Sequence, residues 1–511
     1  GYVHYKLSEF PEAVKWFVDC ITAGDSLKQY AYYYLGECYI RLSNKKSARA
    51  AFKNASRGMH AGIAEDALFN FAKVSYELSN HPYDDAIRAF ERYLTEYPTS
   101  SKITEVREYL VDVYYTTRNY KRAKESLERI ADRGYRLNEA YQKITFYYGI
   151  ELFNKSQYKE AIANFDISIA NALNRDTKIQ ASYWRSESLY RLKEYDEAIE
   201  AYKQFMLEPG ATAFDHYNQA NYNIGYAYFR KRDYPSAILW FRKFVNTNKD
   251  LPTSYKSDAL LRIADCYFVS EDYTNAIEFY DKAILEGNLE VDYALYQSAM
   301  ANGVSGNKSE KANLLLTLTT SHYESVYHDD ALYELGDTYF SLNKTAKALK
   351  EFNKLIEEHP SSSFVRFALL KSSLIHFNQG NEDMALDGFK RVVNEYQETE
   401  ASREALAKIE DIYISKGDIN GYENYLASVP FANVSVASLD SVTYEIGENH
   451  YLAEECDKAV KAFTTYLDKY PQGHFSLNAH YFKADCELRA NYLNEAYLDY
   501  KKVLERKNNE F

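Results

Sequence analysis

The chain of 511 residues has little of what several protein classes require. It has 5 Cys, which form neither a Cys-x-x-Cys pair nor an even-numbered disulfide framework. With 19 Gly and 9 Pro it is neither collagen-like nor of low complexity. No apolar run approaches the roughly 18 residues of a membrane-spanning helix. Acidic residues outnumber basic ones, 74 to 61, which argues against a protein that binds a phosphate backbone through clustered Lys and Arg.

What the chain does contain is aromatic side chains, above all 51 Tyr and 27 Phe. A hydrophobic fraction of 46% suffices for large cores, so the chain is not disordered. Its length implies several domains, or one architecture that grows by repetition.

The sequence repeats itself along almost its whole length. Tyr-Tyr-Leu-Gly-Glu-Cys-Tyr at residues 33–39 is matched by Tyr-Glu-Leu-Gly-Asp-Thr-Tyr at 333–339. In both cases an Ala follows nine residues after the last Tyr, and an aromatic residue follows four positions later. This small residue, which we call the marker Ala, recurs as Ala13, Ala48, Ala86, Ala123, Ala161, Ala198, Ala237, Ala276, Ala312, Ala348, Ala385, Ala459 and Ala496. A degenerate repeat near Gly421 fills the one gap of double length, so we predict about fourteen repeats with a mean period of about 37 residues.

Each repeat is typical of two short amphipathic helices. Apolar or small residues recur at steps of three and four, as in Leu335, Gly336 and Tyr339 of a first helix. Gly in mid-helix lowers helix stability, so we expect a close helix–helix approach at these positions. They are Gly36, Gly149, Gly225, Gly336 and Gly447. All nine Pro lie at predicted helix ends or joints, and no strand-like alternation competes.

The order small residue, aromatic, Ala, aromatic and Pro resembles the tetratricopeptide repeat, whose unit is a helix–turn–helix. The resemblance covers nearly the whole chain. It implies an all-α fold, an α-solenoid in the form of a right-handed superhelix. The sequence departs from the family in its period, because the tetratricopeptide repeat has about 34 residues. Since the spacing within repeats is constant, we expect the extra residues to lie between repeats.

The organisation along the chain is predicted as one array with a weak point. Repeats 1–12 occupy residues 1–428, with degenerate repeats near 301–311 and 415–428, and repeats 13–14 occupy 429–511. The segment from Pro430 to Ser441 is predicted to be a looser joint. Repeat arrays need solvated caps and none follows the last repeat, so we expect this chain to be a piece of a longer one.

No catalytic constellation is present, and we predict no enzyme, no cofactor and no metal site. The segment from Gly303 to Ser309 has the wrong spacing for a phosphate loop. We interpret His322 and His328 as flanking a joint, and the two Asp that follow as suiting a helix N-terminus rather than a metal. Three cysteines fill one recurrent small position and are predicted to be buried thiols: Cys38, Cys266 and Cys486.

In the tetratricopeptide family the first helices line a concave face that binds partners. The position after the small residue is often acidic here, and an aromatic residue often lies four residues before it. Residues i and i+4 lie on one face of a helix, so these positions predict a ladder of aromatic and acidic side chains. The candidate partner-binding residues are Tyr33, Glu37, Tyr183, Glu187, Tyr222, Asp265, Tyr333, Asp337, Tyr444, Glu448, Tyr481 and Asp485.

Two interpretations of this ladder stay open. Its side chains serve the packing of one repeat on the next, or they dock an extended peptide or a helix of basic or polar character. The function we expect is a non-catalytic scaffold for protein–protein interaction, without nucleic acid and without a transmembrane segment in this chain. The alternatives are a structural spacer with no specific ligand, and the regulatory part of a larger protein whose active domain lies outside this segment.

A finer resemblance concerns location. Tyr97-Pro98-Thr-Ser-Ser and His359-Pro360-Ser-Ser-Ser are similar to repeats of bacterial outer-membrane-assembly lipoproteins. The Tyr-rich array resembles large tetratricopeptide proteins of Bacteroidetes. These resemblances imply a periplasmic scaffold in an envelope assembly, held at the outer membrane by an upstream lipid anchor. Because the motif is short, a cytoplasmic location is the alternative.

Overall fold

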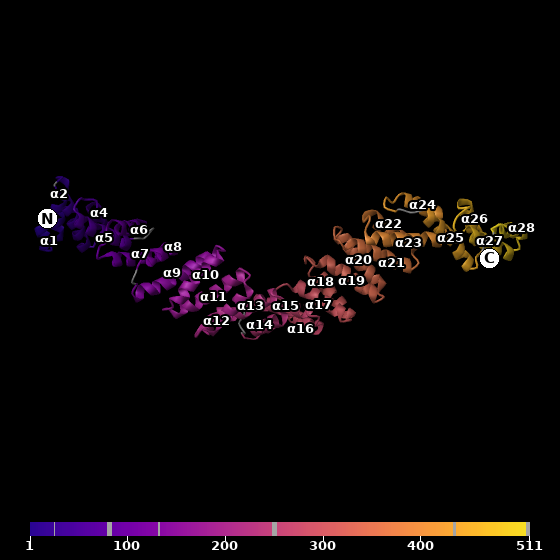
Figure 1. Ribbon diagram of the computed structural model, residues 1–511, viewed down its shortest axis with the longest axis horizontal. Helices are drawn as coiled ribbons and strands as arrows, with labels where there is room; N and C mark the ends of the chain where they lie inside the picture. The colour runs from indigo at the N-terminus through magenta and orange to yellow at the C-terminus, as the bar shows by residue number, and fades with distance from the viewer. Residues whose placement is uncertain (25, 79–83, 131–132, 248–252, 433–435, 507–511) are drawn as a thin grey trace. The chain divides into compact units, whose positions relative to one another are not determined.

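A computed structural model describes residues 1–24, 26–78, 84–130, 133–247, 253–432 and 436–506, and over these residues all regular structure is helical. Helices alternate with short connections in chain order (Figure 1). The contacts divide the chain into two compact parts, Gly1–Leu251 and Pro252–Phe511, which we call the N-terminal and C-terminal halves. None of the described helices is long and apolar enough to span a bilayer.

The N-terminal half holds repeats 1–7. Their first helices are α1 Tyr2–Lys6, α3 Lys28–Arg41, α5 Ala61–Leu78, α7 Ile103–Thr116, α9 Tyr135–Asn154, α11 Arg175–Arg191 and α13 His216–Arg230. Their second helices are α2 Phe10–Thr22, α4 Lys45–Ala55, α6 Asp84–Glu96, α8 Tyr120–Glu128, α10 Tyr158–Ala170, α12 Tyr195–Leu207 and α14 Tyr234–Thr247. One 3-10 turn, Ala211–Ala213, lies between repeats 6 and 7.

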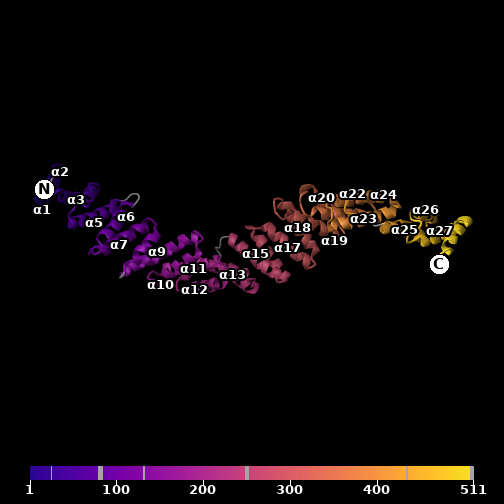
Figure 2. The ribbon, with the colours of Figure 1, turned by 45° about the horizontal axis from the view of Figure 1, so that its top comes forward.

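The C-terminal half holds repeats 8–14 (Figure 2). Their first helices are α15 Thr253–Val269, α17 Val291–Val304, α19 His328–Ser341, α21 Val365–Asn378, α23 Glu400–Lys416, α25 Val436–Leu452 and α27 Ser476–Arg489. Their second helices are α16 Tyr273–Glu286, α18 Lys308–Ser321, α20 Thr345–Glu358, α22 Glu382–Glu395, α24 Ile419–Ala427, α26 Cys456–Lys469 and α28 Leu493–Leu504. The described helices therefore confirm an α-solenoid of fourteen helix pairs.

The marker Ala is buried in every repeat that has one, at most 4% exposed. The predicted close approach at the mid-helix Gly is also confirmed. A Cβ atom added to any of these glycines would lie 2.5–2.8 Å from the ring of the Phe four residues after the marker Ala. The pairs are Gly36–Phe52, Gly149–Phe165, Gly225–Phe241, Gly336–Phe352 and Gly447–Phe463. The ring of the second helix thus fills the space that a side chain would take on the first.

The turn inside a repeat is short, and it is closed by a residue with positive φ, five positions before the marker Ala. In repeat 10, Asn343 has φ 57°, and the N–H of Lys344 donates to the carbonyl of Tyr339 at 2.8 Å. This hydrogen bond satisfies a carbonyl at the helix end. The equivalent non-glycine residues are Ser8, Ser43, Arg118, Ser156, Lys193, Arg232, Glu271, Glu454 and Asn491. This feature was not predictable from the sequence, because Gly marks the position in few repeats.

The joints between repeats are longer than the turns inside them, as predicted. The turn between α3 and α4 spans residues 42–44, whereas the joint between α20 and α21 spans 359–364. Seven Pro lie in first turns or joints, and Pro82 and Pro252 lie outside the described residues. The predicted looser joint from Pro430 to Ser441 is shorter than expected, because α25 already begins at Val436; residues 433–435 lie outside the description.

The boundary between the two halves lies after residue 251, and the division predicted at 428 stays a prediction. The repeat period continues without interruption through residues 251 and 428, so the period alone predicts a boundary at neither.

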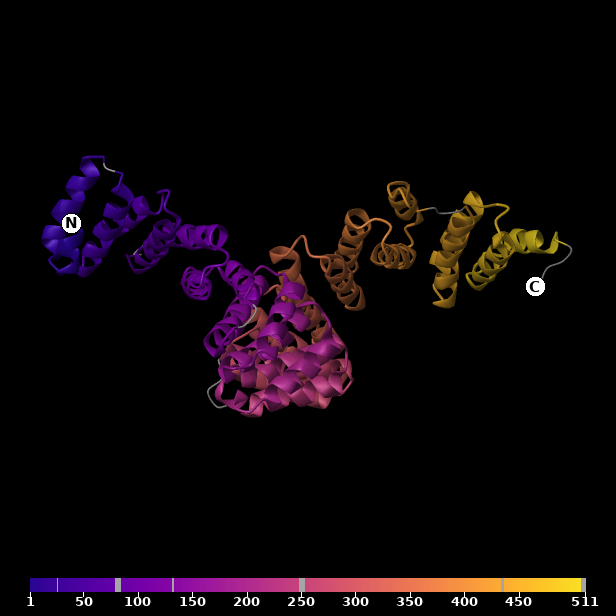
Figure 3. The ribbon, with the colours of Figure 1, turned by 60° about the vertical axis from the view of Figure 1, so that its left-hand side comes forward.

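From α1 to α13 and from α19 to α27, the first helices form the inner layer of the stack. Successive first helices contact each other from α1 to α13 and again from α19 to α27, whereas no comparable contact joins successive second helices in the described chain. A two-layer stack curves toward its more closely spaced layer. Where the outer layer spreads, a cavity of about 530 Å³ opens over α21, lined by Asn353 of α20 and Asp387 of α22 among others. Figure 3 shows the last repeats, in yellow, as helices packed side by side.

Candidate partner-binding surface

The Tyr side chains of the predicted ladder lie on first helices and turn toward the second helix. Tyr333 lies with its ring centroid 6.1 Å from that of Phe352 in the same repeat and 5.1 Å from that of Phe364 in the next joint. Tyr444 stacks on Phe475 with centroids 4.6 Å apart. Burial raises the pKa of Tyr333 to about 12, so its hydroxyl is neutral.

The other ladder Tyr side chains pack in the same way. Their ring partners are Phe52 for Tyr33, Phe205 for Tyr183, Phe244 for Tyr222 and Tyr500 for Tyr481. Tyr183 and Tyr444 are buried, and the remaining four are half-buried. The ladder aromatics therefore have intramolecular contacts, and their role in binding a partner stays a prediction.

The carboxylates of the ladder bridge one repeat to the next. Asp265 accepts hydrogen bonds from Tyr280 of its own repeat and from Tyr293 of the following repeat, both at 2.8 Å. Arg262 lies 2.5 Å from the same carboxylate. Asp337 forms an ion pair with Lys371 on the first helix of the next repeat.

Three further carboxylates of the ladder have described partners in a neighbouring repeat. Glu187 accepts from Tyr202 at 2.5 Å and, across the repeat boundary, from Asn223 at 3.0 Å. The remaining partners across a boundary are Asn70 for Glu37 and Tyr451 for Asp485.

Within the ladder, the Tyr444 hydroxyl donates to Glu448, four residues later on the same helix, at 3.0 Å.

A second aromatic position, which the sequence analysis did not single out, lies nearer the surface of the inner layer. This position is eight residues before the marker Ala. Its side chain contacts the first helix of the next repeat, at the residue that lies fourteen positions before the marker of that repeat. Five such contacts make up what we call the inner stripe: Tyr115–Tyr147, Phe153–Trp184, Phe340–Lys371, Phe377–Lys408 and Tyr451–Phe482.

The inner stripe is accessible as well as regular. Tyr115 and Tyr147 are 39% and 38% exposed, and the other members are half-buried. Lys371 Nζ lies 5.6 Å from the ring centroid of Phe340, and Lys408 Nζ lies 5.8 Å from that of Phe377. The recurrence of an aromatic residue at this position was a signal in the sequence, but only the fold shows that it faces the next repeat.

Within the described chain, one group of three side chains could hold a metal ion: His328, Glu358 and His359. The sequence brings His328 near His322 along the chain, whereas the fold brings it to His359. The three cysteines of the recurrent position are fully buried, as predicted. Burial raises the pKa of the Cys38 thiol to about 11, which suits a structural role.

Family models described as tetratricopeptide repeat match two sets of segments. One model matches residues 30–55, 66–100, 258–286, 330–362 and 367–399, and the other matches 148–210 and 206–252. Together the segments cover about half of the chain. No curated protein matches the chain.

Similar solved structures include a tetratricopeptide repeat protein from Parabacteroides merdae, which is 18% identical, with 49% of this chain and 92% of that chain covered at a TM-score of 0.32. MamA is 23% identical, with 36% and 97% covered at a TM-score of 0.29. YrrB, described as having an unusual peptide-binding site, is 20% identical, with 35% and 86% covered at a TM-score of 0.29. These likenesses concern the fold alone.

Proposed function

Because the chain belongs to the tetratricopeptide repeat family, it is a protein-interaction scaffold, and we propose that its inner layer of first helices binds an extended peptide or a helix. The inner stripe carries this proposal. It presents half-exposed aromatic rings and lysine stems at a repeated spacing on helices that contact each other. Such side chains supply contact area at low entropic cost, and a scaffold without a ligand has no need to keep them exposed.

The ladder carboxylates restrict the character of this partner. Asp337 is already paired with Lys371, so a Lys or Arg of the partner binds there by replacing an internal ion pair. Exchange of one surface ion pair for another changes the free energy little. The proposed partner therefore derives its affinity from contacts with the stripe, and its basic or polar side chains set its position along the ladder.

Site-specific photo-crosslinking tests the proposal. A photoreactive phenylalanine analogue at Phe340 lies on the inner stripe, and the same analogue at Met384, 58% exposed on the second helix α22, is the matched control. We expect a partner to crosslink at position 340 and not at 384. Equal crosslinking at both positions, or at 384 alone, contradicts binding along the inner layer and favours a spacer.

A paired variant measures the contribution of the stripe with the identified partner. Phe340→Ala with Phe377→Ala removes two rings, and we expect the affinity to fall more than about tenfold, as for aromatic interface anchors. Met384→Ala should bind as the unmodified chain does. Circular dichroism checks that the variants keep their helicity. A second double variant, Tyr333→Ala with Asp337→Ala, should also lower the affinity for the partner. It needs the same check, because Tyr333 packs against Phe364.

We also propose a periplasmic place for this scaffold, in an envelope assembly. The support is the recurrence of Tyr-Pro or His-Pro with a Ser two residues later, at the joints after α6 and α20, the motif that resembles envelope lipoproteins. Fractionation of the native cells, with a periplasmic and a cytoplasmic marker protein, tests it. Recovery of the chain with the cytoplasmic marker overturns this part of the proposal and leaves the binding surface untouched.

A further inference from the structure

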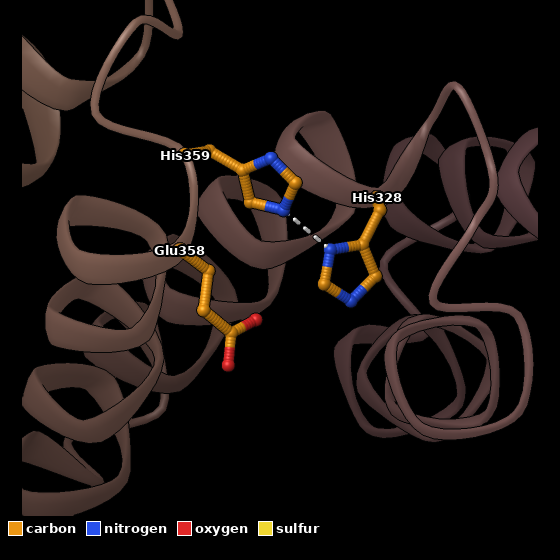
Figure 4. Close-up of side chains that lie close together, drawn as sticks. All are labelled: His328, Glu358 and His359. Atoms are coloured by element: carbon orange, nitrogen blue, oxygen red, sulfur yellow. Dashed lines mark hydrogen bonds between the residues drawn. The ribbon is translucent and has the colours of Figure 1, made fainter.

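Two imidazole rings meet at the open end of the helix hairpin of repeat 10. His328 is the first residue of α19, and His359 directly follows α20. His328 Nδ1 lies 2.7 Å from His359 Nε2, and the carboxylate of Glu358 lies beside both rings (Figure 4). One ligand atom from each of the three side chains lies within 4.8 Å of the other two.

The second nitrogen of His328 fixes which atom carries its hydrogen. Nε2 lies 3.2 Å from the backbone carbonyl of Thr319, which can only accept, so Nε2 is the protonated nitrogen. His328 is 2% exposed, and with the hydrogen on Nε2 the neutral ring carries none on Nδ1. Nδ1 therefore directs a lone pair toward His359. A hydrogen bond from the far nitrogen to a backbone carbonyl is the arrangement that orients metal-binding histidines in proteins.

We propose that His328 Nδ1, His359 Nε2 and the Glu358 carboxylate form a binding site for a divalent transition-metal ion such as Zn²⁺. Two His and one Glu are a donor set that Zn²⁺ uses, with a fourth position for water. Two nitrogens bound to one tetrahedral Zn²⁺ lie about 3.3 Å apart, so the rings need to separate by about half an ångström. The hydrogen of His359 moves from Nε2 to Nδ1 when the ion binds, and no proton is lost.

The donor atoms select the type of ion. Mg²⁺ and Ca²⁺ prefer oxygen ligands, whereas imidazole nitrogens suit Zn²⁺ and its transition-metal neighbours. Lys354 opposes binding of any cation, because its Nζ lies 3.9 Å from the Glu358 carboxylate and 3.3 Å from the carbonyl of Thr319. Its removal should therefore strengthen the site.

The position of the site gives it a structural consequence. His328 begins the first helix of repeat 10 and His359 directly follows the second, so a shared ion joins the two helices at the end opposite to their turn. Thr319 belongs to α18 of repeat 9, so the orientation of His328 also depends on the neighbouring repeat.

Calorimetric titration with Zn²⁺ against a competing chelator tests the site, on the full chain without an affinity tag. We expect one tight site per chain. His359→Gln and Glu358→Gln should each lower the affinity for Zn²⁺ more than about tenfold. Loss of a residue that only hydrogen-bonds to a metal ligand already costs about that much. His322→Gln, which changes a half-buried His of the same joint outside the cluster, should bind as the unmodified chain does. Lys354→Met should bind more tightly.

The visible spectrum of the Co²⁺-loaded protein provides a second measurement, since it distinguishes a four-coordinate from a six-coordinate ion. Circular dichroism of each variant shows that helicity is kept. The proposal is overturned if no tight site is found, if His359→Gln binds Zn²⁺ as well as the unmodified chain, or if His322→Gln removes the binding.

Discussion

At the scale of single residues, the distance between the two helices of a repeat is set by a contact between glycine and a phenylalanine ring. In repeat 10 a Cβ on Gly336 would lie 2.5 Å from the ring of Phe352, which is fully buried. Neither group can yield, because the ring is held by the core and the glycine lies in a helix. The glycine is therefore kept despite its low helix propensity.

This contact leads to a prediction for Gly336→Ala. The added methyl group overpacks the repeat, and we expect the free energy of unfolding to fall by about 1–3 kcal/mol. Gly62 in α5 is the control, because a Cβ there meets nothing within 4 Å. Gly62→Ala should change stability by no more than about 1 kcal/mol, in the stabilising direction. Urea unfolding of both variants gives the comparison, and equal effects would show that the ring moves aside.

A buried carboxylate gives a prediction about pH. Glu351 of α20 is 6% exposed, and burial raises its pKa above the ordinary 4.5. A carboxyl group whose pKa is higher in the folded state destabilises the fold above that pKa, where it is ionised, and has no effect below about 4.5, where both states are protonated. Glu351→Gln should therefore be the more stable protein at pH 7.

The measurement for Glu351→Gln is the difference in unfolding free energy between the two proteins from pH 7 to pH 4. The advantage of the variant should shrink as the pH falls and disappear below about pH 4.5. A constant difference across this range would show that the carboxylate is not destabilised by its surroundings.

At the scale of elements, the helix pairs were predictable from the sequence, because each repeat encodes them locally. The spacing from Tyr339 to Ala348 to Phe352 fixes both helices and the turn between them. The inner stripe was not predictable in the same way. Phe340 meets Lys371, and the identity of that neighbour depends on how one repeat stacks on the next, which no pattern within a repeat contains. The pairing of His328 with His359 was not predictable for another reason: both lie in repeat 10, but 31 residues apart, and only the hairpin brings its open ends together.

In the turn inside most repeats, a non-glycine residue adopts a positive φ, which favours glycine. Glu271 has φ 62°, a conformation that costs a non-glycine residue about 1–2 kcal/mol. Glu271→Gly should raise the free energy of unfolding by about 0.5–1 kcal/mol, since relief of strain exceeds the added entropy of the unfolded chain. Gly380, with φ 75° in the equivalent turn, provides the converse change. Gly380→Ala should destabilise, and thermal unfolding of both proteins tests the pair.

At the scale of the whole molecule, two hydrophobic clusters among the described residues each extend over several repeats. One cluster runs from Leu295 to Ile446, and another runs from Ala48 to Ile144. Among the described helices, each repeat packs against its neighbours in sequence, so stability is a sum of local terms. A defect in one repeat should then spread only as far as the repeats that pack on it.

Substitution of a marker Ala tests this locality. Ala348 is fully buried, so Ala348→Arg places a charge where neither space nor a partner exists, and we expect repeat 10 to unfold locally. Hydrogen exchange followed by mass spectrometry should show faster exchange in repeats 9–11, from α17 to α22, with unchanged exchange in the N-terminal half. Exchange that rises equally in both halves would show that the array unfolds as one cooperative body. Exchange that stays unchanged everywhere would show that the helix packing around the marker Ala is wrong.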